Sequence, residues 1–155
     1  MFQKVLKTAR GKWAVALIIL AILGVISSIS KNEFDNQAII GTIELLIVSA
    51  ILYYSAQKTI NTPASVYWEK WSQVPLNDAQ MRRLERGIEC GFTPKKLNLD
   101  AKYAVIVGSS EYKAYKTTLT KCTCPDFQKR KLPCKHIYYL ALQTGAIDQY
   151  GNAIK

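Results

Sequence analysis

Two long apolar segments lie near the start of the chain. In the rest of the chain, apolar and polar residues are mixed. The first, Trp13–Ser30, has eighteen residues without a charge. As a helix at about 1.5 Å per residue it would be about 27 Å long, near the thickness of a bilayer's hydrocarbon core. The second, Ala38–Tyr54, follows a seven-residue polar loop, Lys31–Gln37, and ends in two tyrosines that suit a membrane interface. The pattern predicts a transmembrane hairpin with helices at about 13–30 and 38–56.

The charges around these segments predict their orientation. Basic residues precede the first segment and follow the second, whereas the loop carries one lysine against two acids. Because basic residues mark the cytoplasmic side, we expect a multi-pass membrane protein with both termini in the cytoplasm. The basic residues are Lys4, Lys7, Arg10, Lys12, Lys58 and Lys70.

Two alternatives to the hairpin stay open. The segments would also suit a helical pair buried in a soluble core, although the polar second half offers little surface to bury them. The basic start and apolar run also resemble a signal peptide, with Ser28–Ser30 as a cleavage site rich in small residues. The second segment would then still hold the C-terminal half inside.

Glu44 is the acidic residue inside the second apolar segment. A charged carboxylate at the centre of a membrane costs roughly 2.5 to 3.5 kcal/mol on insertion scales. An antiparallel hairpin would place it level with Gly24, with Ser27 and Ser28 about a turn away, so a hydrogen bond across the two helices is expected. The functional alternatives are an ion path in a pore or transporter, or a contact between copies in a homo-oligomer.

The segment after the hairpin is rich in aromatic residues and leads to a further helix. Tyr67, Trp71 and Val74 would share one face of a helix that starts at Thr62-Pro63, which suits the membrane interface or the back of the next domain; we favour the interface. Asn77 and Gln80 resemble a capping box. They open a helix that ends at Gly91, with Met81, Leu84 and Ile88 as its buried stripe.

Two strands and one helix are predicted beyond that point. Tyr103–Val107 and Tyr112–Leu119 are joined by a turn at Gly108–Glu111, where glycine permits a tight hairpin. A helix beginning near Lys135 presents Ile137, Leu140, Ala141 and Thr144 to the sheet and stops at Gly145.

Three of the four cysteines and the single histidine lie within fifteen residues, from Cys122 to His136. Zinc takes four tetrahedral ligands of thiolate sulfur and imidazole nitrogen, so Cys122, Cys124, Cys134 and His136 complete a site. Residues two apart in a strand share a face, which suits the first pair. The second pair fits only if Cys134 starts a helix after Pro133. Buried free cysteines or a disulfide remain the alternative, and Cys90 is expected to be a buried structural thiol rather than a substitute ligand.

Basic residues surround the cysteine cluster and cover the preceding helix. Three thiolates and a neutral imidazole leave about one negative charge on a zinc site, which nearby lysines offset and which they favour by lowering thiol pKa values. From Asn61 onward there are fifteen Lys and Arg against eight Asp and Glu. Such an excess binds nucleic acid phosphates or an anionic membrane surface. The expected phosphate or lipid contacts are Arg82, Arg83, Arg86, Lys129, Arg130 and Lys131, with charge compensation as the alternative role.

The motif C-x-C, nine residues, C-x-H, with CTCPDF and PCKHI around the ligands, resembles a SWIM-type zinc finger, including its short bacterial and phage variants. The resemblance covers about residues 82–145. It implies a β-β-α fold, zinc as the cofactor with Cys122, Cys124, Cys134 and His136 as ligands, and a DNA- or protein-binding accessory without chemistry of its own. Such modules accompany chromatin-remodelling helicases, Mutator-like transposases and signalling proteins.

Together these observations predict an α+β chain in three parts: a membrane anchor at 1–58, an aromatic juxtamembrane linker at 59–75 and a zinc-binding domain at 76–155. The expected function is a membrane-tethered adaptor that binds protein or nucleic acid. An enzyme is not expected, because four protein ligands close the metal site and the only histidine is one of them. A small oligomeric pore or transporter with a zinc-stabilised cytoplasmic cap, and a soluble DNA-binding accessory protein, are the alternatives.

Overall fold

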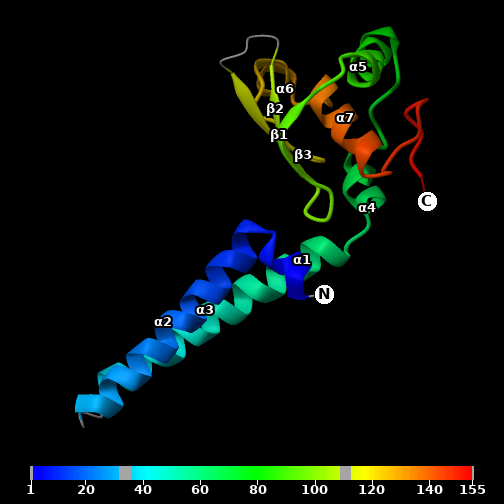
Figure 1. Cartoon of the computed structure of the whole chain (residues 1–155). Helices are drawn as coiled ribbons and strands as arrows, with labels where there is room; N and C mark the ends of the chain where they lie inside the picture. The colour runs from blue at the N-terminus through cyan, green and yellow to red at the C-terminus, as the bar shows by residue number, and fades with distance from the viewer. Residues whose placement is uncertain (1, 32–35, 109–112, 155) are drawn as a thin grey trace. The chain divides into compact units, whose positions relative to one another are not determined.

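The computed structural model describes residues 2–31, 36–108 and 113–154, and it has an α+β fold (Figure 1). The chain divides into two compact units, Met1–Asn61 and Thr62–Lys155. The expected linker at 59–75 spans this division, and its residues from Thr62 onward fold with the second unit.

The first unit is a pair of long antiparallel helices preceded by a short one. α1 spans Phe2–Leu6, α2 spans Ala9–Lys31 and α3 spans Asn36–Asn61 (Figure 1). The Thr8 hydroxyl accepts a hydrogen bond from the Gly11 N–H at 2.9 Å and so caps the start of α2. Both long helices extend beyond their expected limits, and residues 32–35 of the expected polar loop lie outside the described chain.

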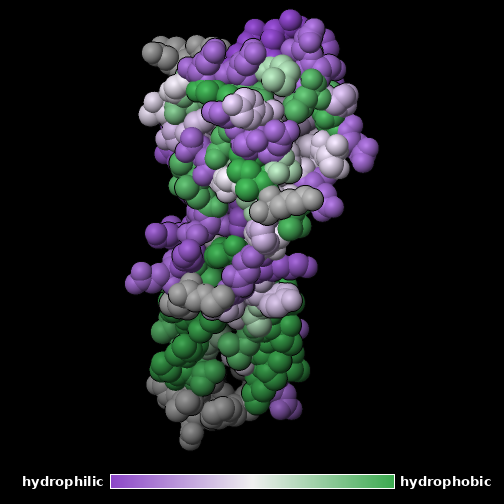
Figure 2. All heavy atoms as spheres, turned by 90° about the vertical axis from the view of Figure 1, so that its right-hand side faces the viewer, coloured by the Kyte–Doolittle hydropathy of each residue, from purple (hydrophilic) through white to green (hydrophobic). Residues whose placement is uncertain are grey.

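Small side chains fill the inside of this unit, and large apolar side chains cover its outside. Ala14 and Ala21 on α2, and Ser49 and Ala56 on α3, are buried. Exposed isoleucine, leucine and valine side chains cover both helices, and Ile51 is 61% exposed (Figure 2). Small residues allow helix backbones to approach closely, as in membrane helix pairs.

Two helices in the described part of the chain are long and apolar enough to cross a membrane, over Ala9–Ser27 and Ile39–Asn61. Helices of this kind also occur in soluble cores, but here most of the apolar surface is exposed rather than buried. The signal-peptide alternative for the first helix stays open.

The expected pairing of Glu44 with Gly24 is wrong. A Cβ built on Gly24 meets the Thr42 side chain at 3.9 Å, so Thr42 is the residue opposite Gly24. Glu44 lies two positions further along α3, about 200° around the helix, and its side chain is exposed. The carboxylate therefore faces outward from the hairpin.

The second unit combines short helices with one antiparallel sheet of order β1-β2-β3. Its sheet pairs Tyr103 with Thr118 and Val107 with Ala114 across β2 and β3. The elements in chain order are α4 Ala64–Trp68, the 3-10 helix η1 Glu69–Trp71, α5 Asp78–Glu89, β1 Pro94–Asn98, β2 Tyr103–Val107, β3 Ala114–Thr118, α6 Pro125–Arg130 and α7 Lys135–Gln143. The two predicted strands and the helix after Cys134 are present, whereas β1 and α6 were not predicted. The expected turn lies largely at residues 109–112, outside the described chain.

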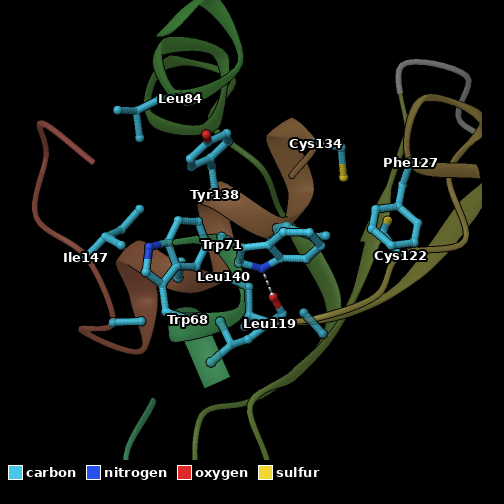
Figure 3. Close-up of a cluster of buried hydrophobic side chains, with 14 of the residues drawn as sticks. Trp68, Trp71, Leu84, Leu119, Cys122, Phe127, Cys134, Tyr138, Leu140 and Ile147 are labelled. Atoms are coloured by element: carbon cyan, nitrogen blue, oxygen red, sulfur yellow. Dashed lines mark hydrogen bonds between the residues drawn. The ribbon is translucent and has the colours of Figure 1, made fainter. Parts of the chain in front are cut away.

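The buried core of this unit lies between the sheet, α5 and α7, and it includes the aromatic residues before α5 (Figure 3). Trp68 and Trp71 are both buried, and the Trp71 indole N–H donates to the Leu119 carbonyl at 2.8 Å. Trp68 packs against the Tyr138 ring with centroids 5.6 Å apart. For the face formed by Tyr67, Trp71 and Val74, the favoured placement at the membrane interface is therefore wrong, and the alternative placement against the next domain is correct.

Helix α5 is fixed by its cap and by contacts with α7. The Asn77 side chain accepts a hydrogen bond from the Gln80 N–H at 3.0 Å, as predicted. Gln80 does not complete the capping box, since its buried amide oxygen accepts from the Tyr138 hydroxyl at 3.2 Å. A Cβ at Gly87 would lie 3.1 Å from both the Lys135 carbonyl oxygen and the Tyr138 Cβ, so α5 and α7 pack closely there.

Two expectations for the end of α5 are wrong. Ile88 was expected in the buried stripe, but it is half exposed. Cys90 was expected to be a buried thiol, but it is exposed and lies outside the cysteine cluster. Leu84 and Gly87 are buried instead, and the backbone of α5 approaches α7 closely at Gly87.

Candidate metal centre

Four residues from three local structures converge on one buried point. After β3, the chain reverses, and Cys122 returns to form a β-bridge with Thr117. Cys124 is the N-cap of α6, in extended conformation, and Pro125 takes the first helical position. Cys134 is the N-cap of α7, and His136 lies in the first turn of that helix. The arrangement of the second pair is as predicted.

The distances fit a tetrahedral zinc ion. The donor atoms of Cys122, Cys124, Cys134 and His136 all lie within 4.8 Å of one another, and all four residues are buried. The Sγ atoms of Cys122 and Cys134 each lie 3.8 Å from His136 Nδ1. Zn–S bonds of about 2.3 Å and Zn–N bonds of about 2.0 Å place tetrahedral ligand atoms roughly 3.6 to 3.8 Å apart. The cluster therefore has the size and the donor set of a zinc site, with Nδ1 as the histidine ligand atom.

Three hydrogen-bond donors lie close to the sulfur atoms of Cys122 and Cys124. The Cys124 N–H donates to Cys122 Sγ at 3.5 Å, and the Phe127 N–H donates to Cys124 Sγ at 3.4 Å. The Thr117 hydroxyl lies 3.3 Å from Cys122 Sγ. Such donors stabilise a thiolate.

Contacts among the sulfur atoms shift the pKa values of two of the thiols in opposite directions. Hydrogen bonds from Cys124 and Cys134 lower the pKa of Cys122 to about 3, and the same sulfur contacts, together with burial, raise the pKa of Cys134. One thiolate thus suppresses ionisation of its neighbour while no cation balances them. A divalent ion removes this conflict, because it allows three thiolates to coexist.

Aromatic rings hold the histidine in place. The ring centroids of Phe92 and Tyr115 lie 5.3 Å and 5.2 Å from that of His136. Gly108 makes room for the Tyr115 ring, since a Cβ there would lie 2.6 Å from Tyr115 Cε2. His136 Nε2 is buried and has no hydrogen-bond partner among the described residues. The imidazole is therefore oriented by packing, with Nδ1 directed at the sulfurs.

The metal ligands belong to the core of the second unit. Cys122 and Cys134 belong to the same buried cluster as Phe127, and Phe127 packs edge-on against Trp71 with ring centroids 6.4 Å apart (Figure 3). Because Trp71 is bonded to the end of β3, the ligands, the sheet and the segment before α5 form one packed structure. Zinc at this point would join all of them.

The structure brings the three predicted arginines of α5 to the metal ligands. Arg82, Arg83 and Arg86 line a cavity of about 380 Å³ whose wall also contains Lys135, Tyr115 and the ligands Cys124, Cys134 and His136. We call this space the arginine cavity. Its one acidic residue among those described is Asp126, which is paired with Arg83 at 3.5 Å and also with Arg130.

The other lysines that were predicted to contact phosphate or lipid, Lys129 and Lys131, do not line the arginine cavity. Lys131 lines a second cavity, of about 490 Å³, together with Lys70, Lys116 and Lys121. We call it the lysine cavity. Lys129 is exposed on α6 and lines neither cavity. Sequence reasoning missed Lys70 and Lys116, because only the fold of the sheet places them beside Lys121.

Comparison with known proteins identifies part of this unit. A family model described as SWIM zinc finger matches residues 103–145, from β2 to just beyond α7 and well under half of the chain. No curated protein and no solved structure matches the chain. The match contains all four residues of the cluster and none of the α5 arginines. Residues 103–145 are therefore a SWIM zinc finger whose cysteines and histidine fit zinc, preceded by helices that lie outside the family match.

Proposed function

We propose that this chain is a membrane-tethered adaptor whose zinc finger unit binds a protein or nucleic-acid partner. One observation carries the proposal: large apolar side chains cover the outside of the first unit, while the second unit has a buried apolar core around the Cys/His cluster and exposes basic residues. Lipid is the surrounding that suits the first surface, and water suits the second.

In this proposal the hairpin is a multi-pass anchor with both termini in the cytoplasm. The exposed basic residues Lys4, Lys7, Arg10, Lys12 and Lys58 support this orientation, because they gather near the N-terminus of α2 and the C-terminus of α3. Trp13 and Tyr54, exposed near the same helix ends, suit the interface between lipid and water. A cytoplasmic second unit also keeps its thiols reduced and available for metal.

Zinc has a structural role in this proposal, and no catalytic step is included. Four protein ligands fill a tetrahedral coordination sphere, so no position is left for a reacting water. The second unit would then act by binding a partner through its basic surface. From Asn61 onward the chain has fifteen Lys and Arg against eight Asp and Glu.

Two measurements on the full chain test the adaptor. After expression, membranes are washed at alkaline pH, which releases peripheral proteins, and zinc is measured in the purified protein. We expect retention in the membrane pellet and one zinc per chain, with zinc lost in Cys134→Ser and kept in Cys90→Ser, a matched change at an exposed thiol. Release of the full chain by the wash would instead favour a soluble DNA-binding protein.

The position of Glu44 supports a second candidate, a small oligomeric pore whose cytoplasmic cap is stabilised by zinc. The carboxylate is exposed on an apolar helix face, where a lumen formed by several copies would hydrate it. Ion flux through reconstituted vesicles tests this candidate. Flux in the wild type that disappears in Glu44→Leu would favour the pore over the adaptor.

A further inference from the structure

The strongest unassigned feature of the second unit is the pair of basic cavities beside the metal cluster. The arginine cavity is bounded by α5, α7 and the start of α6, at Pro125 and Asp126. The lysine cavity is bounded by the sheet, by the rest of α6 at Phe127 and Gln128, and by Lys131 just after that helix. The two cavities therefore flank α6, and both reach residues of the metal cluster.

The charge in each cavity is strongly positive. The arginine cavity has four cations, Arg82, Arg83, Arg86 and Lys135, against the single carboxylate of Asp126. The structure pairs Asp126 with Arg83 and Arg130, and within the described chain it records no ion pair for Arg82 or Arg86. These two guanidinium groups are available to an anion.

The lysine cavity carries no carboxylate on its described walls. Its four lysines, Lys70, Lys116, Lys121 and Lys131, are all exposed. Lysine acts as a point charge toward phosphate, whereas the planar guanidinium of arginine binds two phosphate oxygens at once. One cavity is thus suited to hold a phosphate in a fixed orientation and the other to attract one.

Each cavity also contains an aromatic ring beside its cations. Tyr115 lines the arginine cavity, where packing against His136 and the close approach of Gly108 fix its ring. Tyr103 lines the lysine cavity and is partly exposed. Cations beside aromatic rings bind the phosphates and bases of single-stranded nucleic acid. A phospholipid headgroup or a phosphoserine has no base that could stack on these rings.

We propose that the arginine and lysine cavities are two phosphate-binding positions of one single-stranded nucleic-acid site that crosses α6. This inference rests on the proposed adaptor function and names its partner. The zinc cluster then has a second consequence, because it fixes α6 and α7 and thereby the distance between the two cavities. The α5 arginines extend the site beyond the matched zinc finger segment.

The test compares three double variants of the full chain in nanodiscs of neutral lipid. Arg82→Glu with Arg86→Glu changes the arginine cavity, and Lys116→Glu with Lys121→Glu changes the lysine cavity. Lys95→Glu with Lys129→Glu is the control, because both lysines are exposed and line neither cavity. Each pair lowers the formal net charge of +10 by four, so long-range attraction changes equally.

Binding of a labelled single strand of about 16 nucleotides is followed by fluorescence anisotropy over a range of salt concentrations. We expect each cavity variant to weaken binding about tenfold or more, because hydrogen bonds between charged groups are lost. The slope of log K against log salt should fall by about 1.4, at about 0.7 for each lost phosphate contact. The control should leave the slope unchanged and should change the affinity by less than about threefold.

Three results would overturn the inference. The first is no binding by wild-type chain that holds zinc and stays in the membrane, which leaves the adaptor standing with another partner. The second is an equal loss in all three variants, which shows diffuse charge attraction only. The third is binding to vesicles of anionic lipid, or to a phosphopeptide, without binding to the oligonucleotide.

Zinc content and membrane retention are measured on the same samples. If a glutamate variant loses its zinc, Arg82→Gln with Arg86→Gln replaces it and should still lower the salt slope. A wild-type chain without zinc would contradict the proposed function itself, and this separates the two failures.

Discussion

The two units of this chain differ in which side chains are buried and which are exposed. In the hairpin, large apolar residues face outward and alanine and serine lie inside, whereas the second unit buries tryptophan, leucine and isoleucine and exposes arginine and lysine. Trp13 is 66% exposed and Trp71 is 6% exposed. Burial of apolar area stabilises a fold only where water is the alternative, so the first arrangement is favourable in lipid and the second in water.

The units also differ in what holds them together. Close packing of small residues joins α2 and α3, whose buried residues include Ala14, Ala21, Ser49 and Ala56. The second unit is small, and its core contains the cysteines and the histidine that could bind one zinc ion. Small domains with limited cores commonly depend on metals for stability. The hairpin and the zinc finger should therefore respond to different treatments.

Removal of a metal ligand should produce the largest difference between the units. Cys134→Ser should unfold the second unit, because structural zinc contributes about 10 to 16 kcal/mol in small fingers while a whole domain is stable by about 5 to 15 kcal/mol. Thermal melting followed by circular dichroism measures this effect. Cys90→Ser should melt like the wild type, and a native melt in Cys134→Ser would show that zinc is dispensable.

Substitution of the two tryptophans should give the next largest contrast. Trp71→Ala removes a buried ring and its hydrogen bond to Leu119, at a cost of about 3 to 5 kcal/mol in the free energy of unfolding. Trp13→Ala should leave that free energy unchanged and weaken only partitioning into membranes, because its ring is exposed. Denaturant unfolding of each variant checks the first effect and vesicle flotation the second. Equal destabilisation by both would place Trp13 in a packed core.

Glycine substitutions test where the chain is closely packed. Gly87→Val should destabilise the second unit by about 1 to 3 kcal/mol, because the added atoms meet the Lys135 carbonyl and Tyr138 on α7. Gly41→Val in α3 should be tolerated, since nothing lies within 4 Å of a Cβ there. The midpoint of denaturant unfolding measures both, and a stable Gly87→Val protein would mean that α5 and α7 are further apart.

Loss of a single hydroxyl should give the smallest effect. Burial raises the pKa of Tyr138 to about 12, so its hydroxyl remains a donor to the Gln80 amide. Tyr138→Phe should cost about 0.5 to 1.5 kcal/mol. Tyr54→Phe, at a side chain that is 71% exposed, should cost nothing measurable. Unchanged stability in Tyr138→Phe would mean that solvent satisfies Gln80.

The sequence predicted the elements whose signals are local. An uninterrupted apolar run was enough for each long helix, and ligand spacing was enough for the metal cluster. Pro133 before Cys134 indicated the helix start that brings His136 to the sulfurs. Strand β1 was missed because Pro94–Asn98 is polar and mostly exposed, without the alternation of a half-buried strand. The sequence did not predict α6, although Pro125 follows its N-cap, because six residues are too few to show a helical periodicity.

The failures concern relations between distant segments. An aromatic face on a short helix does not specify what covers it, so Trp71 was assigned to the membrane interface and not to Leu119. The exposure of Cys90 and the placement of Arg82 beside the cluster both depend on the close approach of α5 and α7 at Gly87. Such contacts follow from the packed fold and leave no periodic pattern in the sequence.

The indole N–H signals of the three tryptophans provide the most direct test of the account, because Trp13 reports on the hairpin and Trp68 and Trp71 on the zinc finger unit. Nuclear magnetic resonance of the full chain in nanodiscs would record them before and after a zinc chelator. We predict that the signals of Trp68 and Trp71 move to unfolded positions, that Trp13 is unchanged, and that added zinc restores the spectrum. Unchanged signals of Trp68 and Trp71 after zinc is removed would contradict the account.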